Sequence, residues 1–171
     1  YIILDVPEAI WSNLGLTYLA HTHIDTVWTK QNIELPKLEW NRQEKGVLTL
    51  TRELPNGITY SARIEPKKAH VKMELALTNG SDQLLSDLRV QNCVMLKNAK
   101  GFDSLSNDNK VLKTPFGAVK SMSGNRWIIM AWEPCHRPWG NAKVPCIHSD
   151  PKFPDCQPGK TVKVTGWLSF Y

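Results

Sequence analysis

The chain has 171 residues, of which 42% are hydrophobic and 22% are charged, and its formal net charge is +5 at pH 7. This length predicts a single domain over residues 1–171, and the hydrophobic fraction is sufficient for a substantial core. The basic residues are spread along the chain without an RNA-binding or zinc-finger signature, which argues against a nucleic-acid partner. The charge fits either an acidic ligand or only a soluble surface. No apolar run approaches the ~20 residues of a membrane span, so we expect no membrane partner.

The N-terminal part of the chain predicts a strand that leads into a pair of histidines. Residues 14–20 are apolar and β-favouring, and they are followed by His21 and His23. In a strand, residues i and i+2 point the same way and lie about 7 Å apart, so these two imidazoles could share one metal ion. The spacing from Gly15 to His21 resembles the opening of a cupin-type site, although the Glu that such a site needs is absent. The alternative is two histidines on a polar surface.

The middle of the chain has the clearest strand pattern. Residues 47–52 and 58–65 alternate between apolar and polar, and they flank an Asn-Gly pair that favours a hairpin turn. Residues 71–78 continue the alternation. Residues 88–96 are apolar on both faces, which predicts a strand that is buried on both sides or bulged.

Residues 132–156 form the most unusual part of the sequence. They contain five prolines, three of the four Cys and two of the five His. Prolines argue against a helix or a central strand, so this segment predicts a loop far longer than the usual ~4–6 residues. Its Trp, Cys and His content is not that of a flexible linker, and we therefore expect an ordered, functional loop.

Together these segments amount to about eight or nine strands at hairpin spacing, with no convincing long helix and no internal repeat. The pattern predicts an all-β fold, an antiparallel β-sandwich or jelly roll with one long Pro/Cys/His-rich loop. A small closed barrel is the alternative.

The long loop carries the side chains of a candidate carbohydrate site. A Trp ring can stack on the C–H face of a sugar, while nearby polar groups bind hydroxyls or a carboxylate. We predict that His136 and Glu133 transfer protons and that Arg137 holds an anion. The predicted substrate-binding residues are Trp132, Trp139 and Asn141. The alternative is that the two Trp residues pack over the end of the sandwich with the Arg stacked on them.

The four Cys leave their pairing open. No C-x-x-C motif is present, so neither a thioredoxin-like nor a zinc-ribbon site is supported. A disulfide between Cys146 and either Cys135 or Cys156 would leave Cys93 buried and free, and it slightly favours a secreted or periplasmic location. Buried thiols without a disulfide are the alternative.

The Cys and His side chains also suggest a metal site, with a divalent ion as the candidate cofactor. The predicted ligands are His21, His23 and His148. Within the loop, Cys146 and His148 are two residues apart and would lie on one side of an extended segment, although the spacing of the Cys and His residues matches no standard zinc module.

One region resembles a known superfamily. Residues 57–60, 70–81 and 85–96 together resemble the core of galactose-mutarotase-like β-sandwich proteins, in which a strand ends in an Asn-x-Ser turn, here Asn79 and Ser81, before the next long strand. The likeness covers about 40 residues. It implies a carbohydrate-associated sandwich, and no catalytic residue is carried over because the catalytic motifs of the mutarotases are not recognisable in this sequence.

These observations favour a protein that binds or acts on a neutral or an acidic carbohydrate, and that would use acid–base chemistry if it is an enzyme. Epimerisation, lyase-type elimination and hydrolysis are the reaction types that fit. One alternative is a metal-dependent enzyme that uses the His-x-His pair. A second is a non-catalytic accessory module of a longer chain, because the sequence begins at Tyr1 and ends within a strand-like run.

Overall fold

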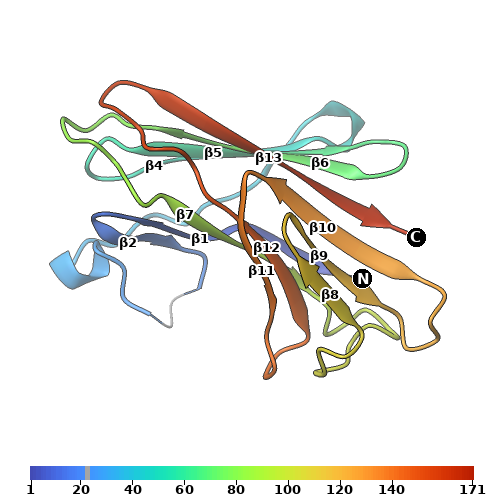
Figure 1. Ribbon diagram of the computed structural model, residues 1–171. Coiled ribbons are helices and arrows are strands. Elements are labelled where there is room, and N and C mark those ends of the chain that lie inside the picture. The colour runs from blue at the N-terminus through green and yellow to red at the C-terminus, as the bar shows by residue number, and fades with distance from the viewer. Residues whose placement is uncertain (22–23) are drawn as a thin grey trace.

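The computed structural model, which describes residues 1–21 and 24–171, is a sandwich of two antiparallel sheets (Figure 1). The five-stranded sheet has the order β11 (Cys135–Gly140), β12 (Cys146–Pro151), β7 (Arg89–Met95), β1 (Ile3–Ser12) and β2 (Gly15–Leu19). The eight-stranded sheet has the order β3 (Asn41–Arg42), β4 (Leu48–Glu53), β5 (Thr59–Pro66), β6 (Val71–Thr78), β13 (Thr161–Phe170), β10 (Trp127–Glu133), β9 (Phe116–Lys120) and β8 (Lys110–Lys113). Two short 3-10 turns, η1 (Thr29–Gln31) and η2 (Glu44–Gly46), complete the described elements. The predicted antiparallel sandwich is therefore confirmed.

The hairpin predicted around the Asn-Gly pair is present as β4 and β5. Gly57 adopts a φ of +80°, a conformation that costs glycine little because it has no Cβ. Its backbone lies so close to Gly80 that a Cβ on Gly80 would collide with the Gly57 carbonyl oxygen. This contact brings the β4–β5 turn beside the turn that follows β6, and both positions require glycine for that reason.

The core lies between the two sheets and follows the predicted alternation. Tyr60 on β5 and Met73 and Leu75 on β6 are buried, whereas the residues between them on each strand are only partly buried. Trp132 on β10 has no exposed surface, and a Cβ on Gly166 of β13 would collide with its indole ring. Gly166 thus makes the space that the largest core side chain occupies.

The predicted burial of β7 on both faces is also confirmed. Val90 and Val94 point into the core, while Cys93 on the opposite face is only 3% exposed. Asn92 is buried among the apolar residues and needs partners there. With its amide oxygen turned toward the indole, Asn92 accepts a hydrogen bond from Trp132 Nε1 at 3.3 Å and donates to the Gln91 carbonyl at 3.3 Å.

The expectation of one long loop over residues 132–156 is wrong, because most of this segment forms the β11–β12 hairpin. β11 is the edge strand of the five-stranded sheet, and β12 pairs on its other side with β7 through Cys146–Met95 and Ile147–Val94. An edge strand tolerates proline because one row of its N–H groups has no ladder partner. Pro138 lies on that edge strand and Pro151 ends β12, which is why the prolines do not prevent pairing.

No helix in the described residues has the length and apolar character that crossing a membrane would require.

Candidate functional site

The Cys and His side chains of β7 and β12, in the five-stranded sheet, lie on the outer face of that sheet, away from the core. Neighbouring residues of a strand point to opposite faces, and Val94 and Ile147 are part of the core. Their neighbours Cys93, Cys146 and His148 therefore point outward. They are nevertheless buried, with exposed fractions of 3%, 2% and 2%.

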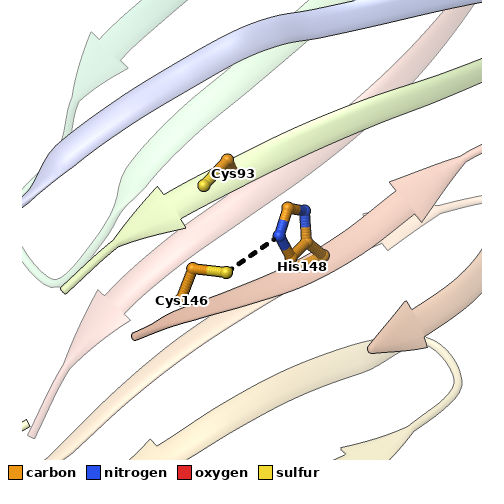
Figure 2. A group of neighbouring side chains, drawn as sticks. All are labelled: Cys93, Cys146 and His148. Carbon is orange, nitrogen blue, oxygen red and sulfur yellow. Dashed lines mark hydrogen bonds between the residues drawn. The ribbon is translucent and has the colours of Figure 1, made fainter. Parts of the chain in front are cut away.

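These three side chains converge from two adjacent strands, as Figure 2 shows. The two sulfur atoms and a ring nitrogen of His148 all lie within 4.8 Å of one another. The Sγ of Cys146 is 3.1 Å from Nε2 of His148. The other ring nitrogen, Nδ1, is buried and has no hydrogen-bond partner in the described structure.

The surroundings of Cys93 and Cys146 shift the pKa values of the two thiols in opposite directions. A hydrogen bond from Cys93 lowers the pKa of Cys146 below that of a free thiol, His148 lowers it further, and burial opposes both effects. The same hydrogen bond and burial raise the pKa of Cys93. The contacts with Cys93 and His148 therefore favour ionisation of Cys146 over that of Cys93.

Carboxylates from two strands approach the free side of His148. Nδ1 is 3.9 Å from Oε2 of Glu8 and 4.0 Å from Oδ1 of Asp150. The carboxylate of Glu8 is also 3.9 Å from Nε2 of His21, and Asp5 is 3.5 Å from the same nitrogen. Glu8 thus lies between the two histidines. The fold therefore brings His21 and His148 to the same carboxylate, that of Glu8.

Asp150 connects the cluster to the edge of the sheet. It accepts hydrogen bonds from Trp139 Nε1 at 2.7 Å, from Arg137 Nε at 3.2 Å and from the Asn92 backbone amide at 3.2 Å. The Trp139 ring stacks on His148 with centroids 3.8 Å apart, and the Arg137 guanidinium lies over Trp139 at 5.3 Å. Burial raises the pKa of the Asp150 carboxyl, while His148 and the three donors oppose this increase.

A small groove opens on the surface beside this network, with a volume of about 90 Å³. It is lined by Trp11, Arg89, Val90, Gln91, His136, Arg137 and Asp150. The guanidinium of Arg89 lies 5.9 Å from the centre of the Trp11 ring, and Gln91 donates a hydrogen bond to Glu8 at 2.9 Å. The groove therefore combines two guanidinium groups, an exposed imidazole and an indole.

The residues predicted from the sequence are divided between this region and other parts of the fold. His136, Arg137, Trp139 and His148 belong to the network or the groove. Trp132 is completely buried, so its ring packs in the core and not over the end of the sandwich.

Two other predicted site residues, Glu133 and Asn141, are not among the residues that line the groove. Glu133 ends β10 in the opposite sheet and does not line the groove. The side chain of Asn141 accepts a hydrogen bond from the Lys143 amide in the turn after β11, and its backbone forms a hydrogen bond with Cys146 that lowers the pKa of this thiol. The prediction for His23 lies outside the described residues.

All four Cys are free thiols in the structure, which corresponds to the alternative without a disulfide. Cys135 contacts Ser149 at 3.6 Å, and Cys156 is buried near the Lys160 carbonyl at 3.2 Å. Cys146 instead lies next to Cys93, because these two residues belong to adjacent strands and share one face. Cys93 itself is buried and free, as expected.

Several residues of the network were not identified from the sequence. Asp5 and Glu8 belong to a strand that had no recognisable motif, and Trp11, Arg89 and Gln91 are far from the β11–β12 hairpin in the sequence. The only available signal was acidic residues within the apolar N-terminal run. That signal does not reveal which strands lie beside β1.

No family model and no curated protein matches the sequence. Among solved structures, the chain is similar to a protein described as a kojibiose phosphorylase from the human microbiome, with a TM-score of 0.50 and 10% sequence identity. The match covers 74% of this chain and 18% of that protein's chain. At this identity the likeness shows the fold alone, a β-sandwich of a kind also found in a carbohydrate-related enzyme. It does not single out a mutarotase-like relationship.

Proposed function

We propose that this chain is a carbohydrate-binding β-sandwich that holds an acidic sugar in the groove beside β11. The observation that carries the proposal is the pair of guanidinium groups, Arg89 and Arg137, in one groove with an exposed His136. A planar guanidinium matches the geometry of a carboxylate and can bind it through two parallel hydrogen bonds. The similarity to a carbohydrate-related sandwich supports the same ligand class.

The size of the groove limits what enters it. Its volume of about 90 Å³ is well below the ~300–1,000 Å³ of a pocket that encloses a whole ligand. The groove therefore receives one substituent of a sugar ring, such as the carboxylate, while the rest of the sugar lies on the surface of the sheet. Trp139 is partly covered by His148 and Arg137 and acts mainly by holding Arg137 in place.

Any acid–base chemistry would use His136. This imidazole is exposed and lines the groove next to Arg137, whereas Glu133 lies on the other sheet. A proton-transfer group must come within hydrogen-bond reach of the atom that it serves, and His136 lines the same groove as Arg137.

The proposal is tested by screening the protein against neutral and acidic glycans and then measuring affinity for the best ligand. We expect a preference for glycans that carry a carboxylate. Arg137→Ala and Arg89→Ala should each weaken binding by roughly 10- to 150-fold, because a hydrogen bond to a charged group contributes ~1.5–3 kcal/mol. Arg63→Ala is the matched control, because Arg63 lies on β5 in the opposite sheet.

Either of two results would contradict the proposal. One is that the wild-type protein binds no acidic glycan. The other is that Arg137→Ala and Arg89→Ala bind every acidic glycan as tightly as the wild type does, while circular dichroism shows that both variants are folded.

A further inference from the structure

We propose that Cys93, Cys146 and His148 form a zinc-binding site, in which Nε2 of His148 is a ligand and Glu8 orients the imidazole from the other side. The proposal is independent of carbohydrate binding, because it concerns the buried cluster and not the surface groove.

The distances between the ligand atoms already suit a tetrahedral zinc ion. With Zn–S bonds of ~2.3 Å and a Zn–N bond of ~2.0 Å, tetrahedral angles place a sulfur about 3.5 Å from the nitrogen and the two sulfurs about 3.8 Å apart. In the structure, Sγ of Cys146 is 3.1 Å from Nε2 of His148, and all three ligand atoms lie within 4.8 Å of one another. Changes of at most ~1.3 Å in these separations would therefore create the site.

The chemistry and location of the ligands favour zinc as well. Two thiolates and an imidazole are soft and borderline ligands, a combination that zinc accepts and that Mg²⁺ and Ca²⁺ do not prefer. The ligands belong to paired strands, which hold them in place before any metal binds. The alternative role for Cys146, as a nucleophile activated by His148, requires contact with a substrate, whereas this side chain is only 2% exposed.

The unpartnered nitrogen of His148 is the second observation that points to a metal. A zinc-bound imidazole normally donates a hydrogen bond from its other nitrogen to a carboxylate or carbonyl. Here Nδ1 is buried without a partner, and the carboxylates of Glu8 and Asp150 lie 3.9 and 4.0 Å away. When Nε2 binds the ion, Nδ1 carries the proton and a small rotation of the ring brings it to Glu8. We assign this role to Glu8, whose Oε2 is also oriented by a hydrogen bond from Gln91 at 2.9 Å.

The local charge also favours a cation. Zinc binding releases the protons of both thiols, and the two buried thiolates are costly unless their charge is compensated. Arg137 pairs with Asp150 on the same face of the sheet, and Lys110 interacts electrostatically with Cys146. A divalent ion between the thiolates would compensate the charge that they gain.

Co²⁺ and Zn²⁺ titrations of the full chain test the proposal, with protein purified without a His-tag, reduced and stripped of metal. We expect Co²⁺ to give thiolate charge-transfer bands and the intense d–d bands of tetrahedral cobalt, and Zn²⁺ to abolish both at a ratio of one ion per chain. X-ray absorption of the Zn²⁺-bound wild type should show two sulfur neighbours at ~2.3 Å and nitrogen at ~2.0 Å. The wild-type measurement is informative even where a variant does not fold.

The variants separate this site from adventitious binding. Cys93→Ser and Cys146→Ser should lose the thiolate bands, whereas the matched controls Cys135→Ser and Cys156→Ser should retain them. Glu8→Gln should weaken Zn²⁺ binding by roughly 10- to 100-fold, as expected for a residue that orients a ligand. The proposal is overturned if the wild type gives no tetrahedral Co²⁺ spectrum, if X-ray absorption shows no sulfur neighbours, or if folded Cys146→Ser retains the bands.

Discussion

The β5–β6 and β11–β12 hairpins have the same antiparallel pairing, but they differ in which faces of their strands are buried. In β5 and β6 the inward residues are buried and apolar, while the outward residues are partly exposed. In β12 all six residues are buried, including His148, Ser149 and Asp150. The difference arises from what covers the outer face, because Trp139 and Glu8 lie against β12 whereas charged pairs cover β5 and β6.

The two hairpins consequently use charge differently. The pairs Lys67–Glu65 and Lys72–Glu74, with N–O distances of 2.7 and 3.6 Å, are on the surface, where such a pair contributes ~0–1 kcal/mol. The side chain of Asp150 is 3% exposed and satisfies three donors. One hairpin thus stabilises the sandwich through its apolar face, and the other positions buried polar groups.

The largest expected effect comes from the apolar face of the first hairpin. Leu75→Ala should lower the free energy of unfolding by ~2–5 kcal/mol, because it removes a buried side chain and leaves a cavity. Urea denaturation followed by Trp fluorescence measures the change. Glu74→Ala, on the outer face of the same strand, is the matched control, with an expected change within ~0.5 kcal/mol. Equal losses in the two variants would remove the distinction between the faces.

A smaller effect is expected from the polar face of the second hairpin. Asp150→Ala should cost ~1–3 kcal/mol of stability, since the Trp139 indole N–H and the Asn92 amide lose their acceptor. It should also release Arg137 and so weaken binding of an acidic glycan. Arg137→Ala is the comparison, because that side chain is 56% exposed and its removal should cost less than ~1 kcal/mol. If Asp150→Ala has wild-type stability, the buried network does not stabilise the hairpin.

The smallest change in the free energy of unfolding at neutral pH is expected for substitution of Tyr60 on β5. The effect of this substitution should become larger at alkaline pH. Burial raises the pKa of Tyr60 above its ordinary value of 10.0. As the pH rises above 10, the unfolded chain releases this proton while the folded chain keeps it, so stability falls. Tyr60→Phe should change stability by less than ~1 kcal/mol at pH 7 and should remove this part of the alkaline loss.

Urea denaturation of wild type and variant at neutral and alkaline pH measures this difference. Tyr171→Phe is the control, because Tyr171 is 71% exposed. A wild-type pH profile in Tyr60→Phe would show that other groups cause the alkaline loss.

Much of the fold could be predicted from the sequence because half-buried strands alternate in a way that can be read locally. The hairpin at the Asn-Gly pair, the inward face of β5 and β6 and the two-sided burial of β7 follow from such patterns. The interpretation of residues 132–156 as a loop failed because proline disfavours a central strand but not an edge strand. Whether a strand lies at an edge depends on its neighbours, which the local sequence does not specify.

The sequence by itself determined the sandwich class and drew attention to the β11–β12 segment, because period-two alternation and residue type are local properties. Only the tertiary structure decided which of its side chains act together. It placed Trp132 in the core, moved Glu133 to the other sheet, and brought Cys93, Glu8 and His21 to the surroundings of Cys146 and His148. The physical reason is that a strand presents its side chains on two faces and pairs with a different strand along each of its two edges. Pairing of β7 between β1 and β12 makes residues more than 50 positions apart adjacent on one buried face.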